Sequence, residues 1–120
     1  MGNYVNLGLI GAGRIGRVHA TNLVSRIPNA RLVAVSDVYL DAAKKASADF
    51  GIPNVYESHQ PILDNPDIDA VAICTVSDTH APLITEAAKA GKHIFCEKPI
   101  ALDLAKIDAA LGTVKQHKVK

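Results

Sequence analysis

The sequence contains no tryptophan and few other aromatic residues, with three Tyr and two Phe among 120 residues. These five side chains are scattered, so a platform that stacks the bases of single-stranded nucleic acid is not expected. The net charge is only +1, because 13 Lys and Arg are balanced by 12 Asp and Glu. So small a charge gives no long-range attraction for a phosphate backbone or an anionic membrane. The composition therefore argues against nucleic-acid binding.

Long apolar runs and cysteine-rich motifs are also missing. No run approaches the roughly 20 residues that cross a bilayer, and the N-terminus lacks the order of a secretory signal. We therefore expect no membrane partner and a cytoplasmic location. Cys74 and Cys96 lie in apolar runs without CxxC spacing, which favours small buried hydrophobic residues over a disulfide or metal ligands. We predict no metal site.

The residues that are present have the composition of one globular domain, with 48% hydrophobic and 21% charged residues. Short β-rich runs alternate with longer runs at helical spacing. We expect strands at 5–11, 31–37, 55–57, 70–75 and 93–97 and helices at 15–26, 41–50, 61–64, 79–90 and 103–116. This alternation predicts an α/β fold: a doubly wound parallel (Rossmann) sheet of about five strands with helices on both faces.

The clearest motif is Gly11-Ala12-Gly13-Arg14-Ile15-Gly16, which follows the first strand and opens the first helix. Here the first glycine permits a tight turn, the second lets the backbone approach a pyrophosphate, and the third allows close packing of helix and strand. The helix N-terminus adds free N–H groups and a partial positive charge. We predict that all six residues bind a dinucleotide. The alternative is a glycine-rich turn that only connects strand to helix.

Asp37 follows Gly16 by about 20 residues, the spacing of the acidic residue that ends the second strand and binds the adenosine ribose. Its carboxylate would repel a 2′-phosphate by about 1 kcal/mol per charge pair at 4 Å in water, and by about 4 kcal/mol at an effective dielectric of 20. We therefore predict NAD over NADP by at least about tenfold. The alternative is an aspartate that only caps a turn or helix.

Polar residues also gather after the fourth and fifth predicted strands, at 75–80 and 97–99. Because ligands of an open parallel sheet lie at the carboxyl ends of its strands, both segments are candidate parts of the site. Ser77, Asp78 and Thr79 also suit the capping of a helix, and Lys98 alone could be a surface lysine. Beside a nicotinamide ring, however, Lys98 becomes a candidate general acid or base.

Taken together, these segments resemble the N-terminal domain of the Gfo/Idh/MocA oxidoreductases, and among them the inositol 2-dehydrogenase-like enzymes. The resemblance covers essentially the whole chain, and it rests on residues 11–19, 36–37, 67–71, 75–80 and 90–101, where Glu97-Lys98-Pro99 is the most specific element. It implies that Lys98 is the catalytic lysine and that the peptide bond between Lys98 and Pro99 can be cis. It also implies that the dinucleotide is lined by Thr75, Val76, His80, Glu97 and Lys98.

The resemblance further implies an NAD-dependent dehydrogenase that oxidises a secondary alcohol of a cyclitol or sugar, with an inositol-like polyol favoured. Family members continue into a C-terminal domain that holds the substrate pocket and the partners of the lysine. We expect residues 1–120 to be the dinucleotide-binding Rossmann domain without that substrate domain, binding NAD with little turnover. We also expect a homo-oligomer, because an open strand edge at 92–97 would recruit other chains. The alternatives are a non-catalytic NAD sensor or regulatory module, and a fragment that folds without an ordered site.

Overall fold

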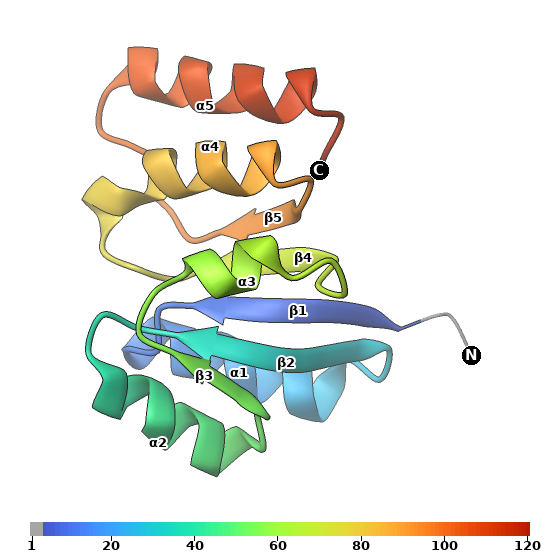
Figure 1. Ribbon diagram of the computed structural model, residues 1–120. Helices are drawn as coiled ribbons and strands as arrows, with labels where there is room; N and C mark the ends of the chain where they lie inside the picture. The colour runs from blue at the N-terminus through green and yellow to red at the C-terminus, as the bar shows by residue number, and fades with distance from the viewer. Residues whose placement is uncertain (1–3) are drawn as a thin grey trace.

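The computed structural model describes residues 4–120, in which strands and helices alternate along the chain (Figure 1). Every strand and helix expected from the sequence is present, with its ends displaced by two residues at most. A short 3₁₀ turn, η1, precedes α4. The elements are β1 (Val5–Ile10), α1 (Arg14–Arg26), β2 (Ala30–Ser36), α2 (Leu40–Phe50), β3 (Asn54–Tyr56), α3 (Gln60–Asp64), β4 (Ala70–Ile73), η1 (Ser77–Thr79), α4 (His80–Lys89), β5 (His93–Cys96) and α5 (Leu104–Gln116).

The five strands form one parallel sheet in the order β3-β2-β1-β4-β5. The chain builds the sheet outward from β1 in one direction and then returns to add β4 and β5 on the other side. The order therefore reverses between β1 and β4, and the carboxyl ends of these strands form the crevice where such sheets bind ligands. The predicted doubly wound Rossmann architecture is confirmed.

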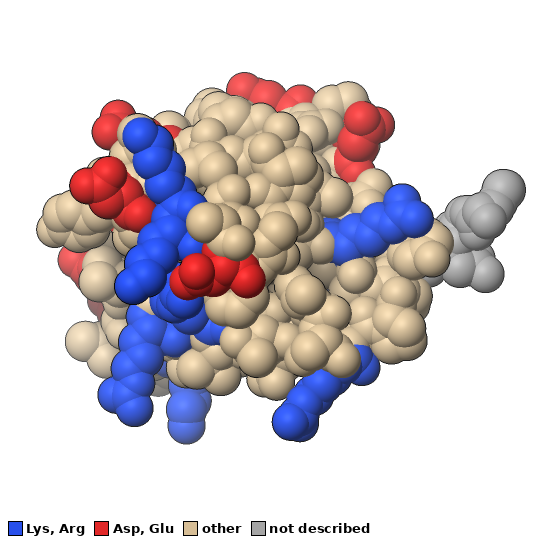
Figure 2. Space-filling model, turned by 90° about the horizontal axis from the view of Figure 1, so that it is seen from below, with Lys and Arg blue, Asp and Glu red and all other residues tan. Residues whose placement is uncertain are grey.

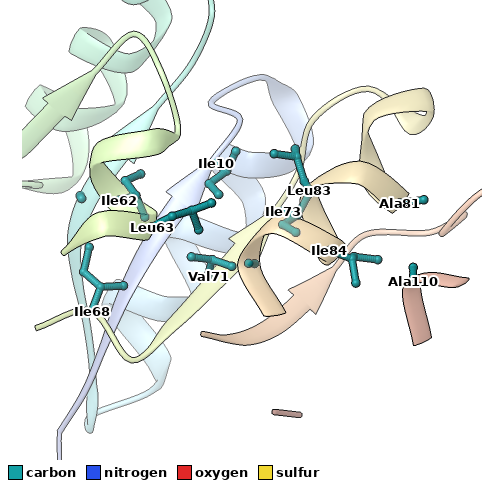
Figure 3. Close-up of a cluster of buried hydrophobic side chains, with 12 residues drawn as sticks. Ile10, Ile62, Leu63, Ile68, Val71, Ile73, Ala81, Leu83, Ile84 and Ala110 are labelled. Atoms are coloured by element: carbon teal, nitrogen blue, oxygen red, sulfur yellow. The ribbon is translucent and has the colours of Figure 1, made fainter. Parts of the chain in front are cut away.

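Each face of the sheet has its own apolar core. One core joins alternate strand residues to α3, α4 and α5 and includes Ile10, Ile62, Val71, Ile73 and Ile84 (Figure 3). The other joins the intervening strand residues to α1 and α2 and includes Leu9, Ala20, Val35, Ala43 and Ala72. Full burial of one large aliphatic side chain contributes about 1.5–3 kcal/mol. Strands covered on both faces explain why residues 70–74 read as one continuous apolar run.

Lys92 is a buried lysine at the amino end of β5, with 5% of its surface exposed. Its Nζ donates hydrogen bonds to the carbonyl oxygens of Asn65, at 2.6 Å, and Ile68, at 2.8 Å. These two carbonyls belong to the loop between α3 and β4. Lys92 therefore links the start of β5 to this loop. The link lies at the amino ends of the strands, opposite to the ligand crevice at their carboxyl ends.

The edge of β5 differs from the open edge expected at 92–97. The Ile94 N–H donates to the Lys120 carbonyl oxygen at 2.7 Å, and the Lys120 N–H donates to His93 Nδ1 at 3.1 Å. The last residue therefore pairs with the first half of β5, because α5 runs antiparallel to the strand and returns the chain to its start. Phe95, further along, keeps 51% of its surface exposed.

The surface carries charges of both signs. On the side seen from below in Figure 1, Asp and Glu side chains lie among the Lys and Arg side chains, with uncharged surface between them (Figure 2). Within residues 4–120, no helix has both the length and the apolar character needed to span a bilayer.

Candidate cofactor-binding site

A cleft of about 610 Å³ opens at the carboxyl ends of β1, β2 and β4. Its volume lies in the range of pockets that hold small molecules and cofactors. The cleft brings together residues from four separate parts of the sequence. Of the residues predicted to bind a dinucleotide, its lining contains Gly11, Gly13, Arg14, Ile15, Asp37, Thr75 and Val76.

The three glycines of the loop after β1 meet three different steric demands. Gly11 has a φ of +101°, and a Cβ there would lie 2.7 Å from the backbone of Cys74. A Cβ on Gly16 would overlap the carbonyl oxygen of Gly11. At Gly13, by contrast, a Cβ would meet no heavy atom of the described chain within 4 Å, so its backbone faces open space. That space is where a pyrophosphate would approach.

The first turn of α1 is suited to an anion. Gly13 is its N-cap residue, and within the described residues no side chain caps this end and no acidic residue lies in the first turn. The N–H groups at the helix start are therefore left for a ligand, and the helix dipole adds about half a positive charge there. The loop and helix together fit the pyrophosphate of a dinucleotide.

Asp37 connects the end of β2 to the glycine loop. Its Oδ2 accepts the Ala12 N–H at 2.8 Å, and its Oδ1 accepts the Tyr39 N–H at 2.8 Å. Asp37 thus caps a local turn and also lines the cleft. A capping role and a place in the candidate site are therefore compatible. Ala12 itself is 3% exposed and packs in the core, and it takes part in the site through its backbone.

Apolar side chains project into the cleft beside these polar groups. Val76 is 69% exposed, Val38 is 77% exposed and Ile15 is 40% exposed, although each lines the cleft. The turn that carries Val76 is held by a hydrogen bond between the hydroxyls of Thr75 and Thr79 at 2.6 Å. Exposed apolar side chains in a concave site offer surface for the flat rings of a nucleotide.

Glu97 and Lys98 follow β5 directly beside this cleft. The sheet register pairs Ile73 with Cys96, so Thr75 and Lys98 each stand two residues beyond a paired position. Lys98 is exposed, and the Lys98–Pro99 peptide bond is cis, as the resemblance allowed. Within residues 4–120, the lining of the cleft does not include Gly16, His80, Glu97 or Lys98. Their predicted contacts with the cofactor stay predictions.

His19 contacts the predicted site residue Glu97, and the sequence did not reveal this contact. Its Nε2 lies 2.7 Å from Glu97 Oε2, and its ring packs edge-on against Phe95 with 5.0 Å between the ring centres. The hydrogen bond from His19 holds the pKa of Glu97 below its usual value, and the positive charge of Lys98 acts in the same direction. His19 lies one helical turn after the buried Gly16, so the spacing indicates that it faces the sheet but not that it meets Glu97.

The two cysteines are free thiols in or at the edge of the core. Burial, reinforced by the Glu97 carboxylate, raises the pKa of Cys74 to about 12 and that of Cys96 to about 11. Both thiols are therefore protonated at neutral pH, which agrees with the structural role predicted for them. Among the residues that the structure describes, no three His, Cys, Asp or Glu side chains are grouped to hold a metal ion.

Comparison with known proteins agrees with this geometry. The inositol 2-dehydrogenase of Rhizobium meliloti is 49% identical over 97% of this chain and 34% of its own length. The myo-inositol 2-dehydrogenase of Thermotoga maritima is 39% identical over 96% of this chain and 34% of its own length. A crystal structure of scyllo-inositol dehydrogenase from Lactobacillus casei, with bound NAD(H) and scyllo-inositol, superposes with a TM-score of 0.91 at 36% identity. That match covers 98% of this chain and 35% of the other.

The chain thus spans about a third of the length of the curated relatives it matches. Residues 5–120 match the sequence profile described as the oxidoreductase family, NAD-binding Rossmann fold. The protein therefore belongs to the Gfo/Idh/MocA oxidoreductase family, and residues 5–120 are its NAD-binding domain.

Proposed function

We propose that residues 1–120 supply the cofactor half of a dehydrogenase that transfers a hydride between NAD and a secondary alcohol of a cyclitol or sugar, with an inositol-like polyol favoured. The observation that carries this proposal is the cleft in which the glycine loop, Asp37 and Val76 meet at the strand ends beside Lys98. The substrate class is supported by the relatives described as inositol dehydrogenases.

Each part of the site has a distinct task in this proposal. The N–H groups at the start of α1 bind the pyrophosphate, and Asp37 accepts hydrogen bonds from the ribose hydroxyls of the adenosine. Val76 and Ile15 contribute apolar surface to the cleft. NAD, when bound, supplies the atom that accepts or donates the hydride.

Lys98 has the task of moving the hydroxyl proton of the alcohol. Its ammonium group is exposed at the end of β5, where a substrate could reach it. Glu97, held by His19 at 2.7 Å, places a carboxylate next to the lysine in the sequence and at the same strand end. We propose that Glu97 contacts the cofactor there and that Lys98 acts as the general acid or base.

The substrate must also be positioned. Holding reacting groups in the right geometry lowers the activation barrier of a reaction by roughly 7–11 kcal/mol. Full-length relatives are about three times as long as this chain. We propose that their additional part positions the alcohol, so that residues 1–120 alone bind NAD with little turnover. A cytoplasmic location belongs to the same proposal.

We also propose that the chain self-associates. Phe95 presents an exposed aromatic ring on β5, the last strand of the sheet, beyond the point where Lys120 pairs with the strand. Edge strands with exposed apolar residues recruit other chains. Sedimentation at increasing concentration tests this: we expect dimers or larger species, and a monomer at high concentration would contradict the proposal.

The enzymatic role is tested by Lys98→Ala in a full-length relative that carries the same Glu-Lys-Pro segment. We expect turnover with an inositol to be lost while NADH affinity, measured by fluorescence, changes little. An alanine substitution at the relative's position that corresponds to the exposed Lys106 of α5 serves as a matched control. Unchanged turnover in the Lys98 variant would remove the lysine from the mechanism.

A further inference from the structure

His80 opens α4 and is almost completely buried, with 1% of its surface exposed. Both nitrogens of its ring face backbone carbonyl oxygens. Nδ1 lies 2.6 Å from the oxygen of Pro99, and Nε2 lies 2.9 Å from the oxygen of Thr75. The ring therefore bridges the segment after β4 and the segment after β5, which leave the sheet on the same side (Figure 1).

The hydrogen-bonding capacity of the ring limits how this bridge can form. A carbonyl oxygen only accepts hydrogen bonds, whereas a neutral imidazole has one N–H donor and one bare nitrogen that accepts. In either tautomer the ring donates a hydrogen bond to one of the two carbonyl oxygens, while its other nitrogen stays within 2.9 Å of the second oxygen.

The two carbonyls belong to residues with different tasks in the proposed site. Thr75 lines the cleft and precedes Val76, which projects into it. Pro99 follows Lys98 directly. The ring itself is anchored, because the next residues of α4 include the core side chains Ala81, Leu83 and Ile84. An anchored ring between the two segments keeps Lys98 at a constant position relative to the cleft.

We propose that His80 is a positioning residue whose buried ring joins the backbone segments of Thr75 and Pro99 and thereby holds Lys98 at a fixed position beside the bound cofactor. The tether itself follows from contacts within this chain. Its consequence for Lys98 rests on the proposed function.

The tether can be tested on the intact chain by ¹⁵N-resolved NMR of the histidine rings, without any ligand. We expect a ring N–H signal of His80 that exchanges slowly with solvent, because the ring is buried between two carbonyl oxygens. A His80 ring N–H that exchanges as fast as that of the exposed His117 would overturn the proposal. This measurement uses the wild-type chain, so it stays decisive even if a variant at position 80 fails to fold.

The positioning role is tested with His80→Gln, whose amide can donate to only one of the two carbonyls that the ring contacts, and with His117→Gln as the control at an exposed residue. NADH should shift the backbone amide signals of Lys98 and Ile100 in the wild type and in the control. In His80→Gln we expect these shifts to be largely lost, although the amide signals of the glycine loop still respond to NADH. If NADH shifts the Lys98 amide signal as much in His80→Gln as in the wild type, the positioning role is overturned.

The two proposals fail in different ways. If the His80 ring N–H is protected from exchange and NADH shifts no signal, the tether holds and the proposed cofactor function fails. If NADH binds and this N–H exchanges as fast as that of an exposed histidine, the cofactor function holds and the tether fails.

Discussion

The carboxylate of Asp37 accepts the backbone N–H of Ala12, with 2.8 Å between Ala12 N and Asp37 Oδ2. This hydrogen bond joins the end of β2 to the glycine loop across 25 residues of sequence. The group that would select the adenosine ribose therefore also helps to shape the loop that would bind the pyrophosphate. Coenzyme choice and loop geometry are coupled through one side chain.

The first prediction concerns that coenzyme choice. The wild type should bind NADH at least about tenfold more tightly than NADPH, because the Asp37 carboxylate repels a 2′-phosphate. Asp37→Asn removes the charge and keeps an oxygen for the Ala12 N–H. We expect this variant to lose most of the discrimination and to bind NADH about three- to tenfold more weakly, since hydrogen bonds to charged groups are the stronger ones.

Fluorescence titration with each coenzyme measures these affinities. Asp41→Asn, at an exposed residue in the first turn of α2, is the matched control. If Asp37→Asn keeps the wild-type ratio of NADH to NADPH affinity, Asp37 does not select the coenzyme.

The second prediction separates two glycines of the same loop. Gly16→Ala should destabilise the fold by about 1–3 kcal/mol, because the new methyl group overlaps the Gly11 carbonyl oxygen. Gly13→Ala meets open space and should change stability by no more than about 0.5 kcal/mol. Its methyl group would instead occupy the approach of the pyrophosphate, so NADH affinity should fall at least about tenfold. Denaturant unfolding and NADH titration of both variants measure the two effects, and a Gly13→Ala variant with wild-type affinity would place the pyrophosphate elsewhere.

Much of the site was predictable because its signals are local in sequence. The glycine loop, Asp37 and the polar ends of β4 and β5 each follow a recognisable strand, and the topology of a parallel sheet brings such ends together. The pairing of His19 with Glu97 was not predictable from spacing, since these residues lie 78 positions apart. Lys92 appears in the sequence as an ordinary polar residue, and His80 was predicted to line the dinucleotide. Only the packing of the loops around them reveals that both are buried. Contacts that depend on how loops pack leave no periodic pattern in the sequence.

The third prediction concerns the buried Lys92. Lys92→Met keeps the aliphatic part of the side chain and leaves the carbonyls of Asn65 and Ile68 without their donor. Because each unsatisfied buried polar group costs about 1–3 kcal/mol, we expect a loss of about 2–5 kcal/mol in the free energy of unfolding. NADH affinity of the folded variant should be unchanged, since Lys92 lies at the opposite end of the sheet. Urea unfolding tests this against Lys89→Met, a substitution at an exposed residue of α4, and equal stability of the two variants would refute it.

The fourth prediction concerns the cysteines. The pKa values of about 12 for Cys74 and about 11 for Cys96 lie above the ordinary value of 9.0. Both thiols should therefore react slowly with a disulfide reagent at pH 8 and rapidly once the chain is unfolded in denaturant. Fast stoichiometric reaction of the folded chain at pH 8 would contradict the raised pKa values of the two thiols.

The same shifts predict how stability depends on pH. A folded-state pKa above the unfolded value means that the folded chain holds its thiol protons more tightly than the unfolded chain. The stabilisation from these two groups is complete below about pH 9 and is lost progressively as the pH rises toward 11–12. Urea unfolding of the wild type and of Cys74→Ala at pH 8 and pH 10 should show a smaller loss between the two pH values in the variant.

The most direct measurement of where the cofactor binds is a crystal structure of the chain with NADH. We expect the pyrophosphate over the backbone of Gly13 at the start of α1, the adenosine ribose hydroxyls on the Asp37 carboxylate, and the nicotinamide ring on the side of the cleft nearest Lys98. NADH bound away from the glycine loop, or with its ribose hydroxyls turned away from Asp37, would contradict the account.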